Sequence, residues 1–141
     1  MLSKLFGGGK PSPPRSIAGG QCFSLICAAR EYYRIEKGWP LPATLARDPV
    51  FVGRLMAMMD MLSEKSGESN LLKPNCRNLF SVIFGEPTAE LAAQLMVGGD
   101  SNPQLIQALV ALEQELPGNA NAKSVMLSRI GLPMVDAFKS R

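Results

Sequence analysis

Residues 50–62 read Val50-Phe51-Val52-Gly53-Arg54-Leu55-Met56-Ala57-Met58-Met59-Asp60-Met61-Leu62, the longest dense apolar run in this chain of 141 residues. Asp48 and Pro49 precede it, an N-cap residue followed by a proline at the first helical position. Gly67 follows it, and glycine is the usual residue just after a helix C-terminus. The stretch therefore predicts a helix over about residues 49–66.

On a helical wheel this helix has one wide apolar face of roughly 160°, which favours a central position in the fold. The face comprises Phe51, Val52, Leu55, Met56, Met58, Met59 and Leu62, with Gly53, Ala57, Asp60 and Glu64 opposite. Val50 and Met61 lie beside Arg54 at its margin. Methionine fills irregular cores and is also frequent on adaptable binding surfaces. We expect the central methionines in the core, and Val50, Arg54 and Met61 at a partner-binding edge.

Length and composition indicate one domain with a substantial core, because 46% of the residues are hydrophobic. Three cysteines without a disulfide-scaffold pattern favour a reducing compartment, so we expect a cytoplasmic protein. No apolar run approaches the length of a membrane span, and the N-terminus lacks the apolar region of a secretory signal.

Further helix-start and helix-stop signals recur along the chain. They predict helices over about residues 21–37, 74–84, 88–97, 103–116, 121–130 and 133–139, with a short turn at 43–47. Gly131-Leu132 is expected to separate the last two. Strand-like alternation is absent. The sequence thus predicts a compact all-α domain of six to eight short helices, covering residues 21–141 and packed around the Met-rich helix.

Residues 1–20 are rich in glycine and proline and contain no acidic residue, which predicts a flexible basic arm. Its cations are Lys4, Lys10 and Arg15. Three interpretations are open: a solvated tail, a peptide that docks on a partner, or an export signal. Charge is uneven beyond the arm as well, since residues 86–115 hold five acidic and no basic side chains.

Within the predicted helix 21–37, Phe23 lies on the side opposite the main apolar face, near Arg30 and Arg34. Two explanations are possible. Either a second layer of structure covers this side, or Phe23 and the two arginines form part of a contact surface for a partner.

Catalytic and cofactor signatures are missing. Residues 7–12 imitate a phosphate-binding loop, but Pro11 follows the lysine and no strand precedes it. Asp100-Ser101-Asn102 imitates a calcium loop, but Leu105 stands where that loop needs glycine. The chain has no histidine to activate a cysteine nucleophile. We expect no enzymatic activity, no cofactor and no metal.

Residues 88–97, followed by 105–113, resemble the helix-turn-helix of bacterial transcription regulators, which implies DNA binding through the second helix and the basic arm. The intervening turn is about three residues longer than in that motif. Met96 replaces its turn glycine, and Glu113 and Glu115 make the second helix acidic. Because phosphate contacts supply much of DNA affinity, nucleic acid is not the expected partner.

The leading hypothesis is a non-enzymatic protein–protein interaction subunit: a small helical adaptor, chaperone-like or accessory component of a larger bacterial or phage assembly, including a secretion assembly. A basic arm and an acidic region favour charge-steered partners. The alternatives are the DNA-binding accessory protein and an exported effector whose acid-free N-terminus is the signal. Homo-oligomerisation through the wide apolar face is left open.

Overall fold

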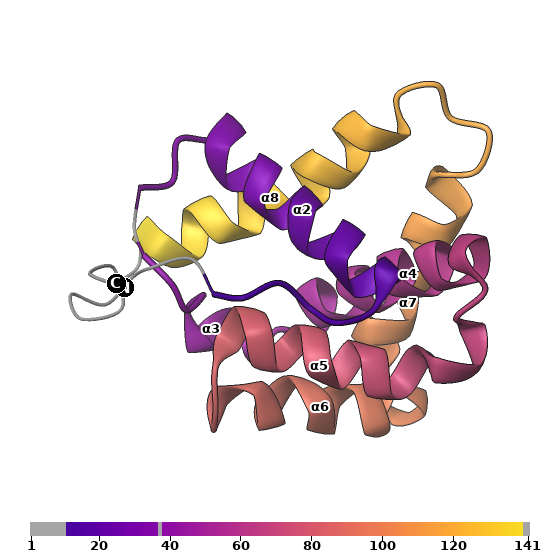
Figure 1. The fold of residues 1–141 in the computed structure, drawn as a ribbon, viewed down its shortest axis with the longest axis horizontal. Helices are drawn as coiled ribbons and strands as arrows, with labels where there is room; N and C mark the ends of the chain where they lie inside the picture. The colour runs from indigo at the N-terminus through magenta and orange to yellow at the C-terminus, as the bar shows by residue number, and fades with distance from the viewer. Residues whose placement is uncertain (1–10, 37, 140–141) are drawn as a thin grey trace.

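The computed structural model describes residues 11–36 and 38–139. These residues form seven α-helices, two short 3-10 helices and no strand (Figure 1). The α-helices are α2 (Ile17–Tyr32), α3 (Ala43–Ala46), α4 (Pro49–Ser66), α5 (Leu72–Phe84), α6 (Thr88–Val97), α7 (Pro103–Glu115) and α8 (Ala122–Lys139). The 3-10 helices are η1 (Ser69–Leu71) and η2 (Gly99–Ser101). The predicted all-α class is confirmed.

Helix α4 is the centre of the fold, as predicted, because it contacts each of the other six α-helices. The Asp48 side chain accepts a hydrogen bond from the Val50 amide at 2.9 Å, and Gly67 ends the helix in the left-handed region at φ 74°. The fully buried large side chains of α4 are Phe51, Val52, Leu55, Met58 and Met59. The local signals thus predicted both ends and the main buried face of this helix.

The opposite face of α4 is also buried in its first half, where α7 packs against it. A Cβ atom on Gly53 would lie 2.6 Å from the backbone oxygen of Leu105 and 3.3 Å from the Ala108 Cβ. Ala57, one turn later, is fully buried as well. Small side chains there let the two helix backbones approach closely, which a polarity pattern alone does not reveal.

Four of the other helices pack around α4 in two pairs. In Figure 1, α2 crosses α8 on one side of the molecule, and α5 runs beside α6 on the other. The α2–α8 pair is tight at Gly131, where a Cβ atom would overlap the ring of Tyr33. Helix α8 also contacts α4, and residues of its first half line a cleft together with the second half of α4 and the end of α7.

The start of α2 corrects the expected boundary of the arm. The helix begins at Ile17 instead of residue 21, with Ser16 as N-cap and Pro14 buried. Its first free amides donate to a distant carboxylate, from Ala18 at 2.9 Å and from Ile17 at 3.2 Å to Glu68. These hydrogen bonds, that from Ala18 foremost, lower the pKa of Glu68. The start of α2 is therefore tied to the domain by a carboxylate far along the sequence.

The end of α2 also differs from the prediction, since the helix stops at Tyr32 and not near residue 37. The Ile35 amide donates to the Arg30 oxygen at 2.8 Å and the Arg34 amide to the Glu31 oxygen at 3.1 Å. This pattern is a Schellman motif with Arg34 in the left-handed position, at φ 53°. Glycine usually occupies this position, so the sequence predicted that the helix would end at Gly38.

The C-terminal segments are one helix, α8, and not two separated at Gly131-Leu132. Pro133 lies inside it, so the Arg129 oxygen lacks the amide that would bond to it four residues later. Arg54 of α4 donates to this oxygen from Nη1 at 3.0 Å. A side chain from another helix thus supplies the missing hydrogen bond, which explains why the proline does not end the helix.

Candidate functional site

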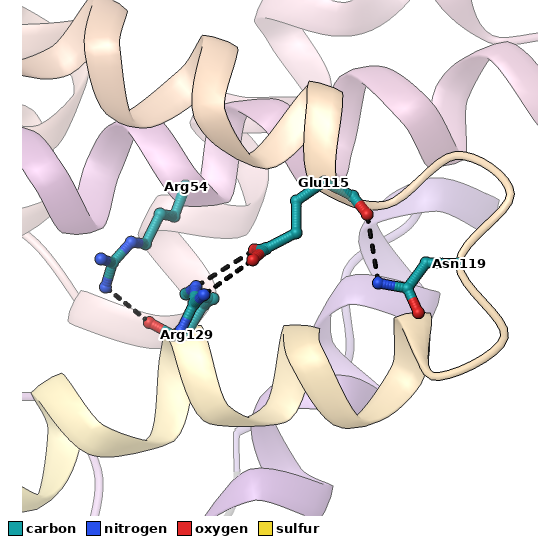
Figure 2. A network of polar contacts seen from close by, with 4 residues as sticks. All are labelled: Arg54, Glu115, Asn119 and Arg129. Carbon is teal, nitrogen blue, oxygen red and sulfur yellow. Dashed lines mark hydrogen bonds and ion pairs between the residues drawn. The ribbon is translucent and has the colours of Figure 1, made fainter.

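A polar network fixes α8 to the neighbouring helices where the α7–α8 loop begins (Figure 2). Arg129 binds Glu115 through two hydrogen bonds, Nε to Oε1 at 3.2 Å and Nη2 to Oε2 at 2.7 Å. The Asn119 side-chain amide donates to the Glu115 backbone oxygen at 3.2 Å. Together with the Arg54 bond, these contacts hold α4, the end of α7 and α8 in one arrangement.

Beside this network lies a cleft of about 770 Å³. We call it the α4–α8 cleft. It is formed by the second half of α4, the end of α7, the α7–α8 loop and the start of α8. Its lining residues are Met58, Asp60, Met61, Leu62, Glu64, Lys65, Glu113, Leu116, Pro117, Gly118, Asn119, Ala122 and Met126.

Two kinds of side chain line the α4–α8 cleft. Thioether and aliphatic groups are contributed by all three helices, namely Met58, Met61, Leu62, Leu116, Ala122 and Met126. Carboxyl groups come from α4 and α7, namely Asp60, Glu64 and Glu113, with Lys65 as the one cation of the lining. The lining of the cleft therefore combines apolar side chains with an excess of acidic over basic groups.

Glu113 is the most perturbed of these carboxyl groups, with its pKa raised to about 7. The main cause is a hydrogen bond with the Asp60 carboxyl group, followed by partial burial and by repulsion from Asp60 and Glu64. Its Oε1 atom is buried and has no hydrogen-bond partner among the described residues. Near neutral pH, Glu113 thus exchanges between a protonated form, which donates to Asp60, and an ionised form that repels it.

The described residues do not assemble a recognisable catalytic or metal centre. No group of three or more Asp, Glu, Cys or His side chains within the described ranges could hold a metal ion. Burial raises the pKa of the Cys22 thiol well above its ordinary range and that of Cys76 to about 12, so neither resembles an activated nucleophile. The chemistry available in the α4–α8 cleft is binding through apolar contact and negative charge.

Three predicted partner-binding residues of α4 fall at two places. Met61 lines the α4–α8 cleft and is half-buried. Val50 and Arg54 line a second cavity of about 440 Å³ with Glu115 and Arg129. Burial and the nearby Arg129 guanidinium lower the pKa of Arg54. The structure therefore brings Val50 and Arg54 together and leaves Met61 in a separate site.

The proposed surface around Phe23 is corrected, because the side chains are covered. Phe23 is only 3% exposed and packs on Trp39 with 5.5 Å between the ring centroids. Arg30 is 8% exposed, with its guanidinium 4.5 Å from the Trp39 ring and 5.3 Å from the Phe138 ring. A second layer of structure that includes Trp39 and Phe138 therefore covers this side of α2. Of Phe23, Arg30 and Arg34, only Arg34 is exposed.

Of the three basic residues of the predicted arm, the structure describes Arg15. Lys4 and Lys10 lie outside the described residues. Arg15 is exposed, and its backbone amide donates to the Asn78 side chain at 3.1 Å. Arg15 is therefore part of the ordered surface next to α5.

Several residues of the cleft were not singled out by the sequence, chiefly Asp60, Glu64, Glu113 and Met126. One signal pointed to them: Glu113 interrupts the leucine stripe of its helix. A carboxyl group in such a stripe requires a polar partner or an opening to solvent, and in the structure Glu113 hydrogen-bonds with Asp60 and lines the open cleft.

Comparisons with known proteins add no functional information. Neither the known protein families, nor the curated proteins, nor the solved structures contain a match to this chain. In the described residues no helix has the length and apolarity needed to cross a membrane.

Proposed function

We propose that this protein is a non-enzymatic interaction subunit that binds a segment of a partner protein in the α4–α8 cleft. The observation that carries the proposal is the cleft itself, about 770 Å³ lined by methionine and leucine side chains from three helices. Cavities of this size accept a few side chains of a ligand. Methionine side chains adapt to different partners, which suits an adaptor.

The finer proposal is a small helical adaptor, chaperone-like or accessory component of a larger bacterial or phage assembly, acting in the cytoplasm. Two observations support it over an enzyme: the lining residues pair no nucleophile with a base, and the charged residues are segregated along the chain. Segregated charge steers association and sets partner choice.

DNA binding has weaker support than protein binding. Helix α7, the second helix of the helix-turn-helix resemblance, contains no lysine or arginine, and its exposed polar side chains are Gln104, Gln107 and Gln114. It packs against α4 through Leu105 and Ala108 beside Gly53. An exported effector would depend on the N-terminal residues, of which 1–10 are outside the described part.

Site-specific photo-crosslinking in cells of the source organism tests the proposal. A photoreactive residue at Met61 is expected to give a discrete protein cross-link. The same residue at Glu90, which is exposed on α6, is the matched control and should not give that product. A Met126→Asp substitution in the Met61 derivative should abolish the cross-link while the melting temperature is retained. Identical products at both positions, or none at Met61, would contradict binding in the cleft.

A further inference from the structure

Building on the proposed function, we propose that the partner segment in the α4–α8 cleft is basic and amphipathic: a helix or turn with apolar residues on one side and lysine or arginine beside them. The inference rests on the shape of the cleft, on its apolar contacts and on the sign of its charge.

The apolar part of the lining calls for bulky aliphatic or aromatic side chains. Met61 and Met126 come from different helices and line the same cleft, with Leu116 between them in sequence at the end of α7. An amphipathic helix laid in such a groove buries residues spaced three or four apart. Unbranched thioethers can adjust to the shape of the inserted side chains.

The charged part of the lining selects cations. The lining holds three carboxyl groups, Asp60, Glu64 and Glu113, and one ammonium group, Lys65. Arg129 of α8 belongs to the polar network, where it is held by Glu115. It does not line this cleft. Lysine or arginine on the partner would relieve the repulsion within the carboxyl cluster, and an acidic segment would add to it.

Binding of a cation should also be linked to the protonation of Glu113. Asp60 and Glu64 of α4 act on Glu113 directly. Lys65 of α4 also lines the cleft, and the α7–α8 loop and α8 contribute the uncharged Asn119, Ala122 and Met126. A lysine near the cluster favours ionised Glu113, so the segment should release a proton as it binds. Affinity is therefore expected to rise between about pH 6 and pH 8, the interval around the raised pKa.

Three synthetic probes test this inference on the full chain with labelled methionine methyl groups. Each is an amphipathic peptide of about four helical turns, made of leucine with lysine, with glutamine or with glutamate. The leucine–lysine peptide should shift the Met61 and Met126 methyl signals and leave the buried Met134 unchanged. It should bind about tenfold more tightly than the glutamine peptide, the equivalent of one favourable charge pair in a sheltered site.

Matched variants show which groups carry the preference. Asp60→Asn with Glu64→Gln should weaken binding of the leucine–lysine peptide about tenfold. Glu90→Gln, an exposed carboxylate outside the cleft, should change it by less than about twofold. Glu113→Gln should remove most of the rise in affinity with pH. Melting curves of each variant establish that it is folded before binding is measured.

The outcomes separate this inference from the proposed function. If the glutamine or glutamate peptide binds at Met61 and Met126 as tightly as the lysine peptide, the cleft is a binding site but the basic partner is wrong. If no peptide shifts these methyl signals, both proposals fall. If the protein alone sediments as a dimer that Asp60→Asn with Glu64→Gln dissociates, the occupant is a second copy and the partner proposal is overturned.

Discussion

Arg54 of α4 donates a hydrogen bond from Nη1 to the backbone oxygen of Arg129 in α8, with 3.0 Å between the two atoms. In an uninterrupted helix this oxygen would accept from the amide of residue 133, which is a proline and has none. One guanidinium group therefore completes the hydrogen bonding of α8 and ties it to the central helix. The first half of α8, which lines the α4–α8 cleft, depends on that connection for its position.

Arg54→Met should destabilise the protein by about 1–3 kcal/mol, because it leaves the Arg129 oxygen without its charged donor. Urea unfolding measures the change, and Arg77→Met on the exposed surface of α5 is the matched control, expected within about 0.5 kcal/mol of wild type. In a Pro133→Ala background the same Arg54→Met change should cost less, since residue 133 then has an amide. An equal cost in both backgrounds would show that Arg54 does not replace the missing backbone bond.

Arg34→Gly should stabilise the protein by about 1 kcal/mol, because Arg34 holds the left-handed position of a Schellman motif where a Cβ atom is unfavourable. Arg34→Ala removes the same side chain but keeps the Cβ atom, and it should leave the stability almost unchanged. Thermal unfolding of the two variants compares them directly. A stabilisation that is the same for glycine and alanine would place the cause in the arginine side chain and not in the backbone.

Gly53→Ala should destabilise by about 1–3 kcal/mol, since its Cβ atom would lie 2.6 Å from the backbone oxygen of Leu105 and would push α7 away from α4. Gly20→Ala is the matched control within helix α2. Its Cβ atom meets nothing within 4 Å, so the higher helix propensity of alanine should stabilise by about 0.5–1 kcal/mol. The opposite order of denaturant midpoints would contradict the close α4–α7 contact.

Those parts of the fold that depend on neighbouring residues were predictable from the sequence. Asp48, Pro49 and Gly67 mark both ends of α4 because capping groups lie within a few residues of the amides and carbonyls they serve. Two of the boundaries that failed depend on distant partners, whereas the end of α2 was missed because Arg34 takes the left-handed position that glycine usually occupies. Glu68 holds the start of α2, and Arg54 supports α8 through Pro133. Local patterns carry no information about such contacts.

The candidate site was predictable only in part. The helical wheel placed Met61 at the margin of α4, and this residue lines the α4–α8 cleft. Glu113 interrupts the leucine stripe of its helix, but the stripe does not tell which group the carboxyl meets. Its pairing with Asp60 required knowing that α7 packs on the face of α4 that carries Gly53 and Ala57. Periodicity defines the faces of each helix, but it does not say which faces meet.

The Glu113–Asp60 pair should make stability depend on pH near neutrality. Between its ordinary value of 4.5 and about 7, the folded protein keeps a proton on Glu113 that the unfolded chain has lost. The folded state binds more protons in this window, so the contribution of Glu113 to stability falls as pH rises through it. Above about pH 7 the ionised carboxyl groups repel each other across the α4–α7 contact.

Glu113→Gln should remove this dependence, because glutamine stays uncharged and still offers Asp60 a hydrogen-bond donor. The variant is expected to match wild type at about pH 5 and to be more stable at about pH 8, with urea midpoints measured across the interval. Glu90→Gln, an exposed carboxylate of α6, should keep the slope of wild type. A Glu113→Gln slope equal to that of wild type would mean that another group binds the proton, because removing the carboxyl group must abolish any titration that belongs to it.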